Sequence, residues 1–206
     1  MGTAPLSKDP YNIVITGVGG QGNVMASRVL SDIMVRNNYS VTIGETFGAS
    51  QRGGSVMSHI RVSRQGAWSP QIPRGKADMV LSLEPIETIR VLQSYGNPDV
   101  KVLANTRPIY PVGVIAGELD YPSLEEIKDS VRELSSMAWF IDAIDQAVKL
   151  GNPILGNIIM IGALSGTGEL SLDREDFREV ILERLPEEKL EINLKAFDMG
   201  ASMVKG

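Results

Sequence analysis

Glycines near the N-terminus have the spacing of an anion-binding loop. Gly17, Gly19 and Gly22 follow the β-branched residues 13–16 in the order G-x-G-x-x-G, and a helix-forming stretch comes next. Gly17 permits a tight turn, Gly19 lets a pyrophosphate approach the backbone, and Gly22 allows a helix to lie close to a strand. The free N–H groups of the first helical turn also attract an anion. The pattern predicts a dinucleotide site, or a loop of the same shape with another use.

Three more residues belong to this candidate site. Gly20 and Gln21 complete the turn itself. Glu45 lies 23 residues after Gly22, near the position at which an acid binds the ribose of a dinucleotide. The alternative is that these glycines only serve the strand–helix turn, because a single G-x-G-x-x-G motif is not specific.

A second loop, residues 45–55 (ETFGASQRGGS), combines glycines, hydroxyls and a cation. Exposed backbone amides and a guanidinium suit a phosphate or a carboxylate. The loop lacks the G-x-S-x-G context of a hydrolase nucleophile, and its alternative is a surface connection with a solvated arginine. Both loops are expected to follow strands at their carboxyl ends and to lie side by side. The candidates in this loop are Ser50, Gln51, Arg52, Gly53 and Gly54.

Three polar residues elsewhere have two interpretations each. Asn105 lies at the end of a predicted strand, so it either reaches the same edge of the sheet or holds a turn. His59 lies in a predicted strand, where a structural role is favoured over that of a base because no acid is near it in the sequence. Asn157 lies in an apolar helix and needs a buried hydrogen-bond partner, which favours a packing role or a subunit contact over catalysis.

The composition excludes several classes of protein. The 206 residues include no cysteine and one histidine, so this chain offers no disulfide, no cysteine-ligated iron–sulfur cluster and no cysteine nucleophile. A net charge of −5 with mixed signs argues against a nucleic-acid-binding protein. No apolar run reaches the roughly 18 residues of a membrane span, and the first residues lack the pattern of a signal peptide. We expect a cytoplasmic protein with no metal site on this chain.

Strand and helix patterns alternate over about the first 150 residues. The alternation predicts an α/β fold: a Rossmann-like open, mainly parallel sheet with helices on both faces and a helical C-terminal extension. The strand at 56–62 should have one solvated face, and 107–113 should be a loop. We predict one domain over residues 1–206, with 1–10 flexible, strands at 12–16, 40–44, 56–62, 77–85, 100–106 and 137–142, and helices at 23–36, 86–94, 123–135, 143–150 and 152–166, followed by two more.

Six stretches of the chain, in order, resemble one protein family. They are NIVITGVGGQG, GETFGASQRGGSVMSHIRV, ADMVLSLEPIE, NTRPIYP, YPSLEEIK and GNIIMIGAL. Together they run from about residue 11 to the C-terminal helices, and they are far more specific than one glycine loop. The chain resembles the gamma-type subunits of 2-oxoacid:ferredoxin oxidoreductases, and in particular the beta subunits of indolepyruvate ferredoxin oxidoreductases.

The resemblance implies a subunit of an enzyme that oxidatively decarboxylates a 2-oxoacid, such as indolepyruvate or another arylpyruvate. It implies that coenzyme A accepts the acyl group and ferredoxin accepts the electrons. Thiamine diphosphate, magnesium and iron–sulfur clusters would sit on partner subunits, against which this chain packs. The chain also lacks the G-D-G motif with a later paired asparagine that marks the thiamine diphosphate site in such enzymes, so we expect it to be inactive alone. An isolated chain can be expected to dimerise through the apolar surface that normally meets its partner.

The motif matches support a functional edge with no catalytic residue of its own. Our hypothesis is that amides 19–22 and Arg52 face coenzyme A or the mouth of the partner's active site. Two alternatives stay open: a stand-alone NAD(P)- or FAD-binding protein, and a non-catalytic assembly module. The residues of the predicted edge are Gly17, Gly19, Gly20, Gln21, Gly22, Glu45, Ser50, Gln51, Arg52, Gly53, Gly54 and Asn105.

Overall fold

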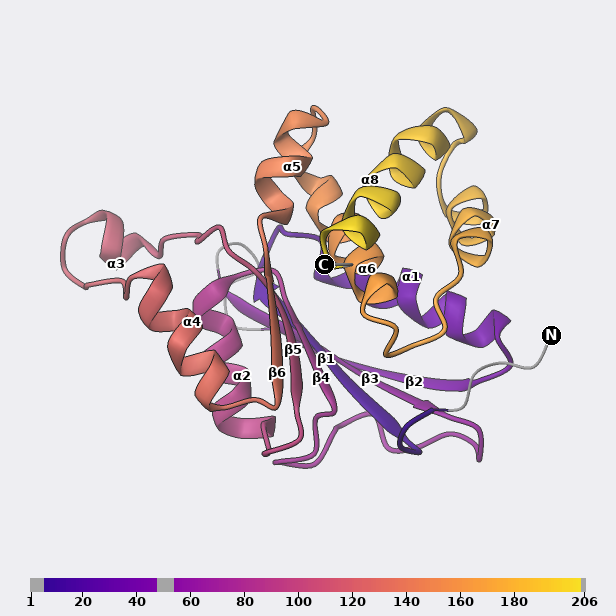
Figure 1. The fold of residues 1–206 in the computed structure, drawn as a ribbon, viewed down its shortest axis with the longest axis horizontal. Coiled ribbons are helices and arrows are strands. Elements are labelled where there is room, and N and C mark those ends of the chain that lie inside the picture. The colour runs from indigo at the N-terminus through magenta and orange to yellow at the C-terminus, as the bar shows by residue number, and fades with distance from the viewer. Residues whose placement is uncertain (1–5, 48–53, 205–206) are drawn as a thin grey trace.

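The fold is built on one twisted sheet, seen in a computed structural model that describes residues 6–47 and 54–204 (Figure 1). Over these residues the sheet has six strands in the order β2-β3-β1-β4-β5-β6. The strands are β1 (Tyr11–Val18), β2 (Ser40–Phe47), β3 (Ser55–Ser63), β4 (Met79–Ser82), β5 (Lys101–Asn105) and β6 (Met137–Ile141). The prediction of an open, mainly parallel α/β sheet is confirmed.

One strand departs from the parallel pattern. β1, β4, β5 and β6 run parallel to one another, whereas β3 lies antiparallel between β1 and β2. The connection from β2 to β3 is a hairpin, because it is too short for the crossover of a dozen or more residues that a parallel pair requires. The alternation of strand and helix therefore fails at this step, and it fails again between β3 and β4, which no helix separates.

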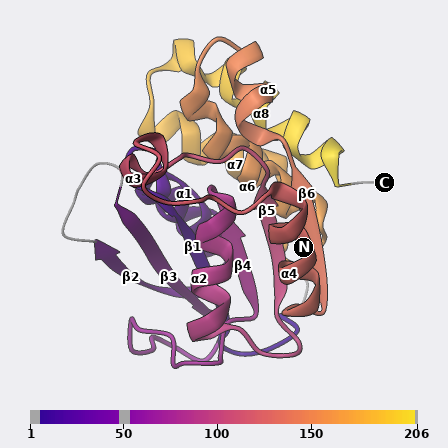
Figure 2. The same ribbon diagram turned by 90° about the vertical axis from the view of Figure 1, so that its left-hand side faces the viewer.

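Helices cover both faces of the sheet, as predicted (Figures 1 and 2). α2 (Pro85–Tyr95) and α4 (Leu124–Glu133) lie on one face, where α2 contacts β1, β4 and β5. The other face carries α1 (Asn23–Arg36), α6 (Gly156–Gly166), α7 (Arg174–Arg184) and α8 (Leu190–Met203). The remaining elements are α3 (Val112–Ile115), α5 (Ala143–Lys149) and the 3-10 turns η1 (Pro153–Leu155) and η2 (Glu187–Lys189).

The residues of β1 show why the sheet is buried on both sides. Ile13 and Ile15 join the apolar core under α1 and α6, while Val14 joins the core under α2. Successive side chains of a strand point to opposite faces, so a strand covered on both faces must be apolar at every position. This accounts for the continuous apolar run of residues 13–15.

Two glycines bring the C-terminal helices close together. A Cβ on Gly162 of α6 would overlap the carbonyl of Phe197, and a Cβ on Gly200 of α8 would overlap the carbonyl of Ile159. The two helix backbones therefore touch across this crossing. The predicted helical extension is confirmed, and it packs on the sheet through α6 rather than extending away from it.

Three details of the predicted elements are wrong. β2 continues to Phe47, so Glu45 lies inside a strand and does not open a loop. The polar side of β3 is not solvated: His59 and Arg61 are buried, because residues 68–72 fold over them. Arg61 donates to Asn12 Oδ1 at 3.0 Å and lies over the Trp68 ring. The expected loop at 107–113 ends at Pro111, because Val112 and Gly113 begin the short helix α3.

Candidate functional site at the carboxyl edge of the sheet

The glycine loop connects β1 to α1 at the carboxyl edge of the parallel strands. Gly20 and Gly22 have φ values of +105° and +87°, in the left-handed region that favours glycine. Gly22 is also the N-cap of α1. A Cβ there would overlap the side-chain amide of Asn157, which donates to the Gly22 carbonyl at 3.4 Å. The absence of a side chain at Gly22 therefore lets Asn157 of α6 pack against the loop, in addition to allowing α1 to begin there.

Gln21 braces this loop from inside. Its Oε1 accepts from the Val18 N–H at 2.8 Å, and its Nε2 donates to the Leu83 carbonyl at 2.8 Å. Asn105 donates to the same Leu83 carbonyl at 3.1 Å. One side-chain amide from the glycine loop and one from the end of β5 thus converge on the residue after β4 and fix the loop relative to β5.

Asn105 holds the turn after β5. It is buried, and besides Leu83 it contacts the Arg107 carbonyl at 3.2 Å and accepts from the Ile144 N–H at 3.2 Å. All its polar atoms are used by protein groups. Of its two interpretations, the geometry favours the structural one, at the edge of the site.

The two predicted loops meet at their bases. The Gly19 N–H donates to the Gly54 carbonyl at 2.9 Å, which joins the glycine loop to the start of β3. The Gln21 N–H is also used, since it donates to the Val18 carbonyl at 3.2 Å. Two of the amides expected to bind an anion are therefore occupied. The predicted residues Ser50, Gln51, Arg52 and Gly53 lie outside the described residues.

Glu45 is not placed where a ribose-binding acid would be. It pairs with Ser58 of β3, which in turn pairs with Ile15 of β1. β3 thus separates Glu45 from β1 by two strand spacings, about 10 Å, and Glu45 is level with the middle of β1 rather than with its end. This geometry disfavours the stand-alone dinucleotide-binding alternative.

A cavity of about 540 Å³ opens beside the glycine loop. Its floor is the loop, from Val18 to Gln21, and its walls come from the segment after β5, from α5 and from η1. The wall residues are Arg107, Ile109, Ile144, Val148, Asn152, Pro153 and Ile154. Most of these were missed in the sequence, because no local pattern brings residues 107–109 and 144–154 to the same loop; only the position of Arg107 after a strand gave a signal.

Arg107 is the cation at this cavity among the described lining residues. Its guanidinium pairs with Asp145 of α5 at 2.5 Å, and both side chains are about half exposed. An exposed ion pair of this kind contributes little to stability and exchanges partners easily. The cavity therefore combines apolar walls with one guanidinium that an incoming anion can recruit.

Glu84 is a second residue that the sequence left unassigned. It follows β4, is fully buried, and caps α2 by accepting from the Glu87 N–H at 3.0 Å. Its other oxygen accepts from the Tyr121 hydroxyl at 2.5 Å and from the Ile109 N–H at 3.4 Å. Burial raises the pKa of Glu84, while these hydrogen bonds act in the opposite direction.

His59 is remote from this edge. It lies in β3 opposite Val14, accepts from the Ile72 N–H on Nδ1 at 3.2 Å, and meets the Tyr95 ring edge-on at 4.9 Å. Burial lowers its pKa, so the neutral imidazole is the favoured form. These contacts fit the structural interpretation.

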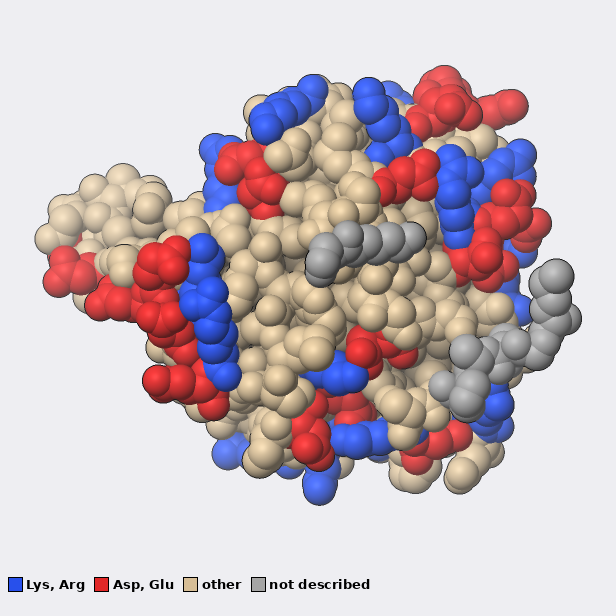
Figure 3. All heavy atoms as spheres, in the orientation of Figure 1, with Lys and Arg blue, Asp and Glu red and all other residues tan. Residues whose placement is uncertain are grey.

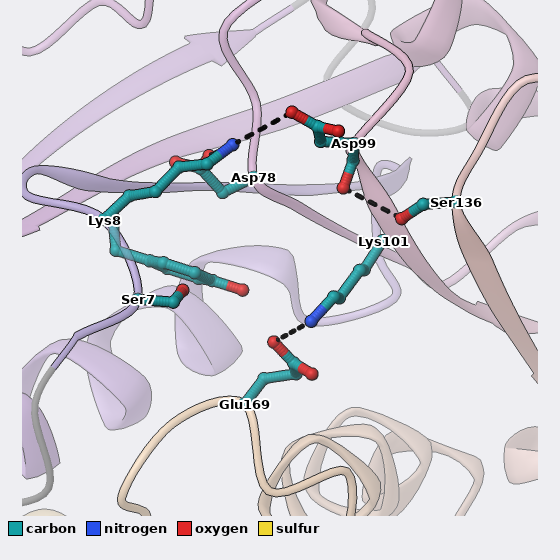
Figure 4. Close-up of a pocket in the computed structure, with 8 residues that line it drawn as sticks. Ser7, Lys8, Asp78, Asp99, Lys101, Ser136 and Glu169 are labelled. Atoms are coloured by element: carbon teal, nitrogen blue, oxygen red, sulfur yellow. Dashed lines mark hydrogen bonds and ion pairs between the residues drawn. The ribbon is translucent and has the colours of Figure 1, made fainter.

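A charged cavity of about 280 Å³ lies at the opposite edge of the sheet (Figure 4). Lys8 pairs with Asp78 at 3.1 Å and with Asp99 at 3.7 Å, and Lys101 pairs with Glu169 at 2.6 Å. Both lysines that line it are therefore paired with carboxylates. This end of the molecule has the character of a structural ion-pair cluster.

A cluster of metal ligands and a membrane-spanning helix are both absent from the described residues. Within residues 6–47 and 54–204, no three His, Asp or Glu side chains are grouped as a metal site would require. In the same part of the chain, no helix has the length and apolar character needed to cross a membrane.

Comparison with known proteins gives the family. A family model described as pyruvate ferredoxin/flavodoxin oxidoreductase matches residues 12–203. The indolepyruvate oxidoreductase subunit IorB of Pyrococcus horikoshii is 42% identical over 196 residues, which cover 95% of this chain and 96% of that protein. The IorB subunit of Archaeoglobus fulgidus is 36% identical over 92% of each chain.

Solved structures show the same fold. The gamma subunit of a keto/oxoacid ferredoxin oxidoreductase from Geobacter sulfurreducens matches with a TM-score of 0.67 at 22% identity, over 94% of this chain and 98% of that one. The 2-oxoglutarate:ferredoxin oxidoreductase of Magnetococcus marinus matches with a TM-score of 0.74 at 21% identity, and the match covers 97% of this chain but 32% of the other.

The chain belongs to the pyruvate ferredoxin/flavodoxin oxidoreductase family. Within that family it is a small, accessory subunit of a 2-oxoacid:ferredoxin oxidoreductase, and the resemblance seen in the sequence is confirmed.

Proposed function

We propose that this chain is the small subunit of a cytoplasmic enzyme that oxidatively decarboxylates indolepyruvate or a related arylpyruvate, with coenzyme A as acyl acceptor and ferredoxin as electron acceptor. The names of the relatives that share 36–42% identity with it support this choice of substrate. Thiamine diphosphate, magnesium and the iron–sulfur clusters belong to the partner subunits in this proposal. A chain without cysteine provides no ligands for a cysteine-bound cluster.

One observation carries the role of this chain: the glycine-loop cavity is apolar, open and free of acid–base groups in its described lining. The groups around it are one guanidinium, the side-chain amides of Gln21 and Asn152, backbone and aliphatic side chains. Such a lining can bind and orient a ligand and exclude water, but it cannot transfer a proton or an acyl group. The cavity therefore serves as one wall of a site that a partner subunit completes.

Within that site, the proposed role of Arg107 is to bind the anionic part of coenzyme A. A guanidinium binds phosphate through charge-assisted hydrogen bonds. Asp145, the partner of Arg107, has a half-exposed side chain, so an incoming anion can replace it. Arg52 and the Gly20 and Gly22 amides are proposed to contribute from the two loops.

Arg107→Ala tests this role in the assembled enzyme. We expect the KM for coenzyme A to rise about tenfold, the scale of one lost charge-assisted contact, with little change in the KM for the 2-oxoacid. Arg178→Ala is the matched control, because Arg178 is similarly exposed and is paired with Glu175 on α7, outside the surface around the cavity and the arm. An unchanged KM for coenzyme A in both Arg107→Ala and Arg52→Ala would show that these residues do not face that substrate.

Co-expression tests the function as a whole. This chain is produced with the thiamine-dependent subunit of the same organism, and dye reduction is followed with indolepyruvate, phenylpyruvate, pyruvate and 2-oxoglutarate. We expect activity that depends on both the 2-oxoacid and coenzyme A, highest with the arylpyruvates, and none from this chain alone. A stable complex with no activity would indicate an assembly module. Tight binding of NAD(H) or flavin by the isolated chain would revive the dinucleotide-binding alternative.

A further inference from the structure

A projecting arm, residues 107–121, carries the largest group of exposed apolar side chains described in this protein. Val112, Ile115 and Leu119 are 82%, 74% and 64% exposed, and Ile109 and Tyr110 are exposed beside them. α3, at the tip of the arm, buries none of its residues. Figures 1 and 2 show the arm extending beyond α2 and α4, away from the sheet. Grouped apolar side chains on a protein surface mark an interaction site.

The arm is a folded element. The Ala116 N–H donates to the Val112 carbonyl at 2.8 Å, and the Glu118 and Leu119 N–H groups both donate to the Gly113 carbonyl. Its tip is therefore closed by its own backbone. A pre-formed surface loses little conformational entropy when it binds.

Glu84 fixes both ends of the arm to the sheet. One carboxylate oxygen accepts from the Ile109 N–H, where the arm leaves β5, and from the Tyr121 hydroxyl, where the arm returns to α4. The rings of Tyr110 and Tyr121 meet edge-on at 5.0 Å across the same base. The direction of the arm is thus set by a buried group at the carboxyl edge of the sheet.

The arm is continuous with the glycine-loop cavity. Arg107 and Ile109 belong both to the base of the arm and to the wall of that cavity. Whatever binds the arm therefore lies next to the cavity, which is the position of the subunit that would complete the site.

The charge around the arm defines its partner. Residues 118–133 contain six acidic and two basic residues, and Figure 3 shows acidic side chains below the apolar tip and along α4. A matching surface has an apolar groove flanked by lysine or arginine. A second copy of this chain docked arm to arm would bring the two acidic flanks together, which is repulsive.

We propose that the arm docks into an apolar groove, flanked by basic residues, on the catalytic subunit of the complex; this inference rests on the proposed function. Val112, Ile115 and Leu119 fill the groove, and the acidic residues of the arm and α4 face its basic rim. Docking brings the glycine-loop cavity against the partner.

The test measures the affinity of purified variants for the purified catalytic subunit. We expect Val112→Asp and Ile115→Asp each to weaken binding tenfold or more, because a buried apolar anchor at an interface is replaced by a charge. Val35→Asp is the matched control: Val35 is 54% exposed, near the end of α1 at the other edge of the sheet, and this change should alter the affinity less than twofold. All three sites are exposed, so the thermal midpoints should stay close to that of the wild type.

A charge-reversal variant tests the rim separately. Glu118→Lys with Asp120→Lys should lower the association rate and weaken its dependence on salt. Three results are decisive. Wild-type affinity in the Val112 and Ile115 variants overturns the docking inference alone. If those variants lose self-association but bind the catalytic subunit as the wild type does, the arm contacts a second copy of this chain. That result also overturns the docking inference. A wild-type chain that fails to bind the catalytic subunit overturns the proposed function together with the inference.

Discussion

Gly22 shows how one residue of a familiar motif can have a different use. In a dinucleotide loop the third glycine lets the helix approach the strand, whereas here its missing Cβ leaves room for the side chain of Asn157. The pattern predicted that a glycine is needed at this position. It could not predict the neighbour, because Asn157 lies 135 residues further along the chain.

Gly22→Ala should therefore destabilise the protein more than Gly20→Ala. Both changes place a side chain in the left-handed region, which costs about 1–2 kcal/mol, but a Cβ at Gly20 meets open space and one at Gly22 meets Asn157. We expect an additional loss above about 1 kcal/mol for Gly22→Ala, measured by urea denaturation. In the Asn157→Ala background this additional loss should shrink; equal losses in both backgrounds would contradict the contact.

Glu84 gives the stability a defined dependence on pH. Its pKa is raised in the folded protein, chiefly by burial, so the folded state holds this proton more tightly than the unfolded chain does. The protonated Glu84 therefore contributes to the free energy of unfolding. This contribution is fully present below about pH 4.3, the ordinary pKa of glutamate, and is lost as the pH rises through the raised pKa of the folded state. Glu84→Gln should remove this part of the pH dependence of the unfolding free energy.

Tyr121→Phe should extend to higher pH the range in which protonated Glu84 stabilises the fold, because the Tyr121 hydroxyl lowers the pKa of Glu84. At pH 7 the change should also cost about 1–3 kcal/mol through the lost hydrogen bond to a buried carboxyl group. Tyr110→Phe is the control. The Tyr110 ring takes part in the same edge-on ring contact, but the hydroxyl that donates to the Glu84 carboxylate is that of Tyr121. Identical pH profiles for the two variants would contradict this account.

At the scale of elements, local patterns predicted most helices and strands but not the order of the strands. The capping box of Ser123 and Glu126 starts α4 as expected, and Gly96 follows the end of α2. The insertion of β3 between β1 and β2 depends on which strands form hydrogen bonds with one another, and no local pattern in the residues of β3 indicates this. The burial of His59 and Arg61 was missed for the same reason, since residues 68–72 cover them only in the folded chain.

The position of the candidate site could be predicted from the sequence, but the contacts that form it could not. Both loops follow strands and Asn105 ends one, so their common edge could be expected from the order of the elements. The Leu83 carbonyl lies 62 residues from Gln21 and 22 from Asn105 in the sequence, and only the folded sheet brings the two amides to it. The walls of the cavity and the Glu84 anchor depend on the same kind of long-range convergence.

The α6–α8 crossing depends on its glycines. Gly200→Ala should destabilise the protein by about 1–3 kcal/mol or more through overpacking, although alanine favours a helix by up to about 1 kcal/mol over glycine. A gain in the free energy of unfolding would show that the helices can separate without cost. Ser202→Ala in the same helix is the control, because Ser202 is exposed and its hydroxyl donates only to the Met199 carbonyl of its own helix.

At the scale of the whole molecule, the two edges of the sheet have different characters. The carboxyl edge has the glycine loop, the apolar cavity and the arm, while the opposite edge has charged residues that pair with one another. The division places the proposed contact with the catalytic subunit at one end of the strands.

Changes at the charged edge should therefore leave the assembled enzyme active. Lys101→Met with Glu169→Gln removes a partly exposed ion pair, and we expect the unfolding free energy to change by no more than about 1 kcal/mol. The kcat and both KM values of the complex should match the wild type, in contrast to Arg107→Ala. A large loss of activity here would show that the partner reaches this edge as well.

The hydrogen bond from Gly19 to Gly54 makes one amide proton a natural probe of the candidate site. That proton can exchange with deuterium only when the glycine loop and the start of β3 separate, so its exchange rate reports how often this junction opens. Coenzyme A or a partner subunit that braces the two segments would slow the exchange at Gly19 before any change in the rest of the sheet. A single resonance in a nuclear magnetic resonance spectrum of the labelled chain would then follow assembly of the site directly.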